Sequence, residues 1–343
     1  MHDTQFNREF FCTRPISRNR KFVFLKHGLL FLLTFFTATI AGSIYPFGPL
    51  QIFADTSNAE LSYGLWDYVY LPIYYAQFVI ELIKVIFADY ELLKTGISFS
   101  ASLLFILLTH EAGHYFACRL YGVSASLPYF IPVPPLIGPA GTLGAFIRIR
   151  SRIPSRTATF DIGVAGPIAG FIALIPVATL GIIQMKYNPN VHASSVDLTF
   201  SDPLLMVFLA KMVGVDLSSL GYMKMNSFYA AAWLGLLVTA LNLMPVGQLD
   251  GGHATYALFG RRLHFIIGLL AFIFMLTIAL TGLIFFNSPS GIVFSILMGF
   301  MLMLPHPRPI DETPLDLKRK LIGLFVLLIF VLSFVPFPIH IHQ

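Results

Sequence analysis

Residues 101–120 read ASLLFILLTHEAGHYFACRL, so that His110, Glu111 and His114 lie between two apolar runs. Of the 343 residues in the chain, 56% are hydrophobic and only 11% are charged, whereas roughly 25% are charged in an average soluble domain. This composition excludes a soluble globular protein, a disordered chain and a coiled coil. The stretch is therefore expected to be a membrane-spanning helix, and ionisable groups within such a helix usually mark a functional site.

The other apolar runs predict an all-α polytopic membrane protein with about six transmembrane helices, because a helix needs about 20 apolar residues to cross a bilayer. Candidate segments are residues 22–45, 97–121, 157–185, 228–244, 263–286, 291–304 and 321–335. The chain then divides into a cytoplasmic N-terminal tail (1–21), a first span with an outer interfacial segment (22–96), an intramembrane core (97–255) and C-terminal transmembrane helices (256–343).

The segment between the second and third candidate spans is interrupted by prolines, among them Pro128, Pro132, Pro134 and Pro135, which exclude a continuous helix. Within it, residues 145–150 read AFIRIR and alternate with a period of two, as a half-buried strand does. We expect a small β-hairpin at about 125–151, near the cytoplasmic side. Its edge could accept an extended substrate segment as an added strand, although a purely structural hairpin would show the same pattern.

The lysines and arginines indicate the orientation of the chain, because cytoplasmic loops of membrane proteins collect these residues. If residues 65–88 do not cross the bilayer, all but five of the 22 lysines and arginines lie on the side of the N-terminal tail. We therefore expect residues 65–88 to form an interfacial or re-entrant helix on the outer side, with a true span as the alternative. Cys12 and Cys118 then fall on the cytoplasmic side, where a structural disulfide is not expected.

His110 and His114 lie one helical turn apart and within about 40° of each other around the helix, so both imidazoles can reach one metal ion. Glu111 lies on the same side of the helix. Two histidine ligands next to a carboxylate base form the arrangement of zinc hydrolases. Two histidines packed between helices would be the structural alternative, but ionisable groups in a span are costly without a function.

Zinc at a catalytic site usually has three protein ligands and one position for water. The best candidate for the third ligand is Asp250, in the stretch NLMPVGQLDGGH at residues 242–253. Proline and glycines in this stretch would break a regular helix and allow the backbone to turn Asp250 towards the metal. His253 is the rival ligand. Taken alone, Asp250 followed by two glycines would equally suit an ordinary loop turn.

These two motifs together resemble those of the site-2 protease family of intramembrane zinc metalloproteases. The resemblance also covers FIRIRS at 146–151 and DIGVAGPIAG at 161–170, and so extends over roughly residues 97–255. It implies one Zn²⁺ per chain, bound by His110, His114 and Asp250, with Glu111 as the catalytic base. It also implies that Asn242 helps to hold the substrate or the developing oxyanion. No PDZ-like insertion is expected, because no segment of soluble composition and domain length separates the two motifs.

The resemblance implies an enzyme, a zinc metalloendopeptidase that cleaves within or near transmembrane segments of membrane proteins in regulated intramembrane proteolysis. Its partners would be transmembrane substrates and the lipid bilayer. Nucleic acid is not expected as a partner, despite the net charge of +5, because the basic residues flank apolar runs. We expect a multi-pass protein of the bacterial cytoplasmic membrane, with a plastid membrane protein as the alternative.

Two other functions fit part of this pattern. A metal-ion transporter or metal-binding membrane protein could use the same histidines and aspartate, but transporters often contain internal repeats and neither motif has a second copy. A zinc protease that cuts outside the bilayer generally takes its third ligand from a downstream glutamate. The next glutamate after His114 is Glu312, in a proline-rich cytoplasmic loop, which disfavours this alternative.

Overall fold

The structure is a computed structural model that describes residues 20–44, 65–134, 140–187, 198–217, 223–286 and 288–341. Most of the expected N-terminal tail, including Cys12, lies outside these residues, and Cys118 is a buried free cysteine. The helices are α1 (Arg20–Ile44), α2 (Leu65–Ala88), α3 (Tyr90–Leu120), α4 (Arg156–Gln184), α5 (Leu204–Val213), α6 (Ser227–Asn242), α7 (Asp250–Phe285), α8 (Ser290–Met303) and α9 (Leu317–Ser333). The all-α polytopic fold class is confirmed.

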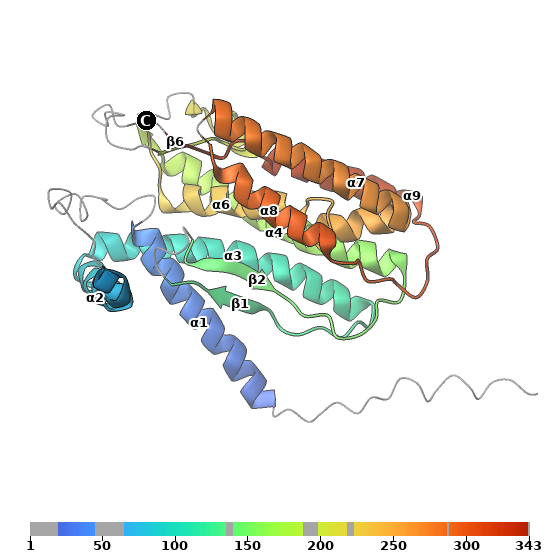
Figure 1. Ribbon diagram of the computed structural model, residues 1–343, viewed down its shortest axis with the longest axis horizontal. Coiled ribbons are helices and arrows are strands. Elements are labelled where there is room, and N and C mark those ends of the chain that lie inside the picture. The colour runs from blue at the N-terminus through green and yellow to red at the C-terminus, as the bar shows by residue number, and fades with distance from the viewer. Residues whose placement is uncertain are drawn as a thin grey trace, which may run out of the picture.

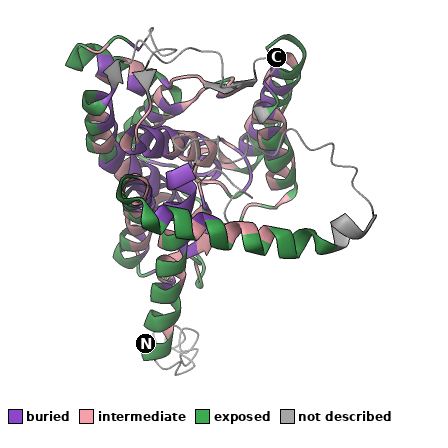
Figure 2. Cartoon of the chain, turned by 90° about the vertical axis from the view of Figure 1, so that its left-hand side faces the viewer, coloured by how far each residue is buried: buried purple, intermediate pink, exposed green. Residues whose placement is uncertain are grey.

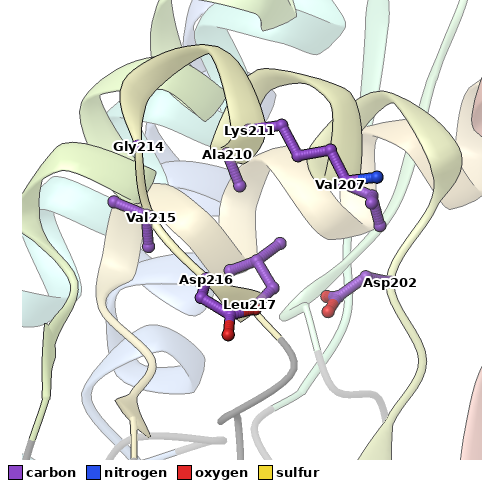
Figure 3. Close-up of a pocket in the computed structure, with 8 residues that line it drawn as sticks. All are labelled: Asp202, Val207, Ala210, Lys211, Gly214, Val215, Asp216 and Leu217. Atoms are coloured by element: carbon purple, nitrogen blue, oxygen red, sulfur yellow. The ribbon is translucent and has the colours of Figure 1, made fainter.

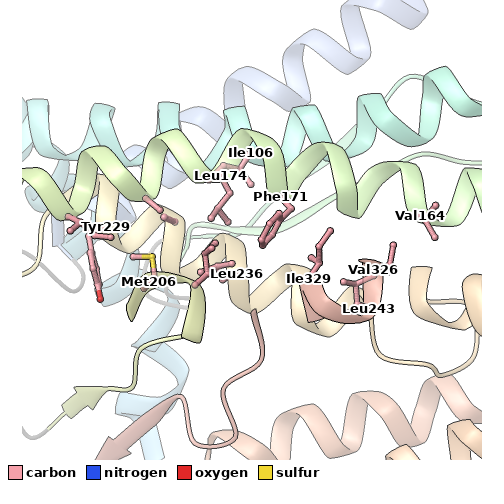
Figure 4. Packing of buried hydrophobic residues seen from close by; sticks show 14 of the residues in the cluster. Ile106, Val164, Phe171, Leu174, Met206, Tyr229, Leu236, Leu243, Val326 and Ile329 are labelled. Carbon is pink, nitrogen blue, oxygen red and sulfur yellow. The ribbon is translucent and has the colours of Figure 1, made fainter. Parts of the chain in front are cut away.

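A bundle of helices forms the body of the molecule, with α4 lying between α3 and α6 (Figure 1). Its largest apolar cluster joins Phe171 and Leu174 of α4 to Leu236 of α6 and Ile329 of α9 (Figure 4). By length and composition, five helices of the described chain could cross a membrane, namely α1, α2, α3, α4 and α7. Large apolar side chains on the outside of α7 and α9 remain exposed, as expected where lipid is the solvent.

Helix α7 consists of two segments that meet at Gly260, whose φ of 78° lies in the left-handed region. Thr255 Oγ1 and His264 Nδ1 are 2.9 Å apart across this break. In a straight helix, residues nine positions apart would be separated by about 13 Å along the axis. The chain therefore turns back at Gly260, and residues 250–259 form a short helical segment of their own.

The predicted β-hairpin is present. Strand β1 (Tyr129–Pro132) pairs antiparallel with β2 (Thr142–Phe146), and an isolated bridge joins Ala125 to Ile149. Helix α1 holds the hairpin in place, because His27 Nδ1 is 2.8 Å from the carbonyl oxygen of Pro128 and the Thr37 hydroxyl donates to the carbonyl oxygen of Gly141. The hairpin lies alongside α1 and α3 (Figure 1).

Helix α2 lies across the bundle rather than along it. In Figure 1 it is viewed nearly end-on beside the start of α3, whereas α3 and α4 run across the page. Figure 2 shows the same helix lengthwise, exposed over most of its surface. Glu81 and Lys84 form an exposed ion pair on it, with 2.6 Å between Oε1 and Nζ. This arrangement is compatible with an interfacial helix, although α2 is also long and apolar enough to span.

Some elements were not predicted from the sequence. They are helix α5 and two short antiparallel pairs, β3 (Lys186–Tyr187) with β5 (Met223–Lys224) and β4 (Leu198–Phe200) with β6 (Ile339–Ile341). The paired strands contain only two or three residues each, so period-two alternation gives no usable signal. Helix α5 has ten residues, which is too few to cross a bilayer.

A polar clamp fixes α9 to α3 and α4 at the end of the bundle where α4 begins. Arg319 donates to both carboxylate oxygens of Asp161, with Nη2 2.7 Å from Oδ2, and its guanidinium also bonds to Tyr121 and Asp316. The Tyr121 hydroxyl donates to Asp161 as well. Such bidentate pairing fixes geometry as well as charge.

Candidate metal centre

Three side chains from two distant helices converge between α3 and α7. His110 Nε2 lies 3.1 Å from His114 Nε2 and 3.2 Å from Asp250 Oδ2, and His114 Nε2 lies 3.3 Å from Asp250 Oδ1. Among the described residues, this is the only group of three or more metal-ligating side chains with ligand atoms within 4.8 Å of one another. The two histidines are buried, and the Asp250 side chain is 15% exposed.

The ligand set fits a zinc ion. Ligand atoms about 2.0–2.2 Å from a tetrahedral zinc lie about 3.3–3.6 Å from one another, and the three separations of 3.1–3.3 Å lie at or just below the lower end of this range. Two imidazoles and one carboxylate are also the donor set of many catalytic zinc sites, which leave a fourth position open. The convergence of these three groups is the arrangement expected from the sequence.

The protein fixes the tautomer of His114. Its Nδ1 lies 2.7 Å from the carbonyl oxygen of Ile162 on α4. A carbonyl oxygen accepts hydrogen bonds, so Nδ1 carries the proton and the lone pair of Nε2 faces the other two ligands. A backbone carbonyl bound to the far nitrogen of a ligating histidine is a common means of orienting it.

Asp250 reaches the histidines because the chain before it is tightly folded. It lies in the first turn of α7, after a non-helical stretch that follows the end of α6. A Cβ atom on Gly251 would collide with the carbonyl of Leu243, and one on Gly252 with that of Gly247. Because Gly251 and Gly252 have no Cβ atom, the backbone segments can pack this closely at the start of α7. The ordinary loop turn that the sequence also allows is not formed.

Glu111 and Asn242 lie beside the ligands. Glu111 is buried, and its carboxylate interacts with the backbone N–H of Ile147, just past the end of β2. Asn242 is the last residue of α6, and its Nδ2 lies 3.4 Å from His110 Nε2. The structure therefore brings all five residues singled out from the sequence into one place.

Helix α4 forms a floor of small residues beneath the histidines, which the sequence analysis did not foresee. A Cβ atom on Gly166 would collide with the His114 ring, and one on Gly170 would lie 3.0 Å from the Cβ of His110. A Cβ atom on Gly113, inside the histidine motif, would lie 2.4 Å from the carbonyl oxygen of Ala165 and would collide with it. Gly166 and Gly170 belong to a GPxxG stretch in α4. The spacing of its glycines also matches that of the histidines, one turn apart.

The rival ligand His253 is bound elsewhere. Its Nδ1 lies 2.7 Å from Nε2 of His306, and it does not belong to the group of three. The ring of His306 in turn stacks on Tyr256, with 4.2 Å between centroids and 10° between planes. The structure thus favours Asp250 over His253 as the third ligand.

A separate cavity of about 550 Å³ lies beside α5 (Figure 3). Asp202, Lys211 and Asp216 are among its lining residues. The Asp202 carboxylate accepts a hydrogen bond from Tyr229 near the start of α6, whereas Asn242 ends that helix about 20 Å away. The cavity is therefore remote from the three ligands.

Comparison with protein-family models matches residues 98–286, more than half of the chain, to peptidase family M50. The chain belongs to this family, the site-2 protease family of membrane zinc metalloproteases. Its apolar helices and this membership make it an integral membrane protein.

Several curated proteins similar to the chain come from plants. The protein named probable zinc metalloprotease EGY2, chloroplastic, of Oryza sativa subsp. indica is 29% identical over 254 residues, which cover 74% of this chain and 45% of that protein. Probable zinc metalloprotease EGY1, chloroplastic, of Arabidopsis thaliana is 28% identical over 258 residues, covering 72% and 44%. The chain thus spans less than half the length of these relatives. No solved structure matches the chain.

Proposed function

We propose that the protein is an intramembrane zinc metalloprotease that hydrolyses peptide bonds within or near transmembrane segments of membrane-protein substrates. The observation that carries this proposal is the meeting of His110, His114 and Asp250 within 4.8 Å, with Glu111 adjacent, inside a bundle of apolar helices. We propose His110, His114 and Asp250 as the zinc ligands, Glu111 as the base and Asn242 as a substrate-binding residue.

Each residue has a defined task in this proposal. Zinc held by the three ligands would acidify a water molecule and polarise the scissile carbonyl. The Glu111 carboxylate accepts the proton of the attacking water and then delivers it to the departing amine. The Asn242 amide, close to His110, is placed to donate a hydrogen bond to the substrate carbonyl oxygen.

The position of the hairpin supports an extended substrate. A helical peptide hides its carbonyl groups in its own hydrogen bonds, so a transmembrane substrate has to unwind before cleavage. Strand β2 is followed directly by Ile147, whose N–H interacts with Glu111. A substrate segment that pairs with the hairpin would therefore run close to the base, which is why we propose strand addition here.

Comparison of membrane proteomes tests the proposal. Cells that carry the Glu111→Gln protein should accumulate single-span membrane proteins that cells with the active protein cleave, at matched levels of the two forms. Equal proteomes would count against intramembrane proteolysis. Zinc-dependent transport that survives Glu111→Gln would favour the alternative of a metal transporter.

The membrane in which the protein resides belongs to the same proposal. The bacterial cytoplasmic membrane expected from the sequence has no support from the relatives, since their names call them chloroplastic. Fractionation of the source cells, with detection of the protein in separated membranes, decides between a cytoplasmic and a plastid membrane.

A further inference from the structure

Residues 304–316, between α8 and α9, form an extended segment that we call the strap. The strap lies outside residues 98–286, which match the family. Its backbone pairs with the chain before α4, because Ile310 N–H donates to the carbonyl of Ile153 and Arg156 N–H donates to that of Asp311. Gln248 donates from Nε2 to the carbonyl of Pro305, over 3.0 Å. The strap thus joins the start of α4 to the chain that leads into Asp250.

His306 is the residue of the strap that contacts His253, three positions after Asp250. Its ring stacks on Tyr256, and its two nitrogens have separate partners. Nδ1 lies 2.8 Å from the carbonyl oxygen of Pro307, and Nε2 lies 2.7 Å from Nδ1 of His253. His306 therefore connects the strap to the helical segment 250–259.

These contacts determine which nitrogen carries each proton. The Pro307 carbonyl only accepts, so His306 Nδ1 carries a proton and the neutral ring presents the lone pair of Nε2. His253 must then donate from Nδ1, and its own Nε2 is left without a proton. Burial and the imidazoles of His253 and His264 lower the pKa of His306 to about 3, so that His306 stays neutral at neutral pH.

The tautomer of His253 matters because of its neighbour. His253 follows Asp250 by three positions on the same helical segment, so the two side chains share one face. Side chains at this spacing have their Cβ atoms about 5–6 Å apart, which lets an imidazole reach a carboxylate on the same face. An imidazole with a free N–H beside a carboxylate would form a charge-assisted hydrogen bond with it. The N–H of His253 is instead directed to His306.

We propose that His306 is a positioning residue that holds His253 in the tautomer with no N–H for Asp250, and so leaves the Asp250 carboxylate to the metal. The inference rests on the proposed zinc site. Without the acceptor on His306, the N–H of His253 competes with the metal for Asp250, and zinc binds more weakly.

The test measures the zinc affinity of the purified full-length protein in detergent, by competition with a zinc chelator. His306→Phe keeps a ring against Tyr256 but accepts no hydrogen bond, and should weaken zinc binding about tenfold, the usual scale for loss of an outer partner. His306→Gln retains an acceptor oxygen at a similar reach and should bind zinc nearly as the wild type does. His264→Phe, which changes another imidazole of the same cluster, is the matched control and should leave the affinity unchanged.

A double mutant separates this role from a merely structural one. In a His253→Ala background the competing N–H is absent, so adding His306→Phe should cause no further loss of zinc affinity. An equal loss in both backgrounds, or wild-type affinity in His306→Phe, would overturn the proposal. If phenylalanine prevents folding, His306→Leu takes its place. The measurement needs no substrate, so its outcome is independent of whether Glu111→Gln abolishes proteolysis.

Discussion

Asp250 and His253 lie three residues apart on one helical segment, yet they have different neighbours. Asp250 faces His110 and His114, and His253 faces His306. We expect the wild-type protein to purify with close to one zinc per chain. Asp250→Ala should reduce this content sharply, because a ligand is lost, whereas His253→Ala should change it little. Metal analysis of the purified proteins is the measurement, and the reverse pattern would make His253 the third ligand.

Glu111 can be separated from metal binding by a substitution that preserves its size. Glu111→Gln should keep zinc bound, since Glu111 lies outside the group of ligands. An amide is no base at neutral pH, so cleavage of a transmembrane substrate should fall by about 10²–10⁴-fold. Cleavage at the wild-type rate by the purified variant would refute the assigned role.

Much of the site could be predicted from the sequence, because helical spacing alone places His110 beside His114. Asp250 could be named as the best candidate from its glycine-rich stretch, with His253 as the rival, but a separation of 140 residues carries no local signal that places it beside the histidines. The contacts of Gly166 and His306 could not be predicted at all. These contacts depend on how the elements pack against one another in the folded protein, which no local sequence pattern specifies.

Helix α4 offers a test of how closely the site is packed. Gly166→Ala adds a Cβ that collides with the His114 ring, so the ring or the helix has to shift. We expect zinc affinity to fall and the protein to lose about 1–3 kcal/mol of stability, as is typical of overpacking. Thermal unfolding and zinc competition in detergent provide the two readouts.

The control for this substitution is Gly28→Ala in α1. A Cβ on Gly28 meets nothing within 4 Å, and alanine favours a helix over glycine by up to about 1 kcal/mol. Gly28→Ala should therefore leave zinc affinity and stability unchanged or slightly raise stability. If both alanine variants behaved alike, close packing of α4 against His114 would not matter.

The helices themselves were predicted within a few residues at most ends, because long apolar runs are strong signals. The turn at Gly260 was not foreseen, since a lone glycine in an apolar run is also tolerated within a helix. The strap was expected as a proline-rich loop, and its pairing with residues 153–156 was missed. Those bonds join parts of the chain more than 150 residues apart, beyond the reach of any local pattern.

At the scale of the whole molecule, the orientation in the membrane depends on α2. We predict that α2 does not cross the bilayer and that both of its ends lie on the outer side, opposite the N-terminus. Only then do the basic clusters before α4 and α9 share a side with the N-terminal tail. An impermeant thiol reagent should therefore label single cysteines at positions 57 and 95 from the same side, after Cys12 and Cys118 have been replaced.

The matched control for this labelling is a single cysteine at Arg262, which the same orientation places in the cytoplasm. This cysteine should react with the impermeant reagent only after the membrane has been permeabilised. Labelling of positions 57 and 95 from opposite sides would show that α2 spans, and would reverse the orientation of every later helix.

The separation of the metal ligands along the chain also governs how the protein is made. Asp250 is synthesised 140 residues after His110, which at ~5–20 residues per second takes roughly 7–28 s of translation. During that interval α3 has to enter the membrane with His110, Glu111 and His114 but without the third ligand. A ribosome stalled before residue 250 would leave an inserted chain with an incomplete site. With the proposed ligand set, we therefore expect stable capture of zinc only after Asp250 has been made.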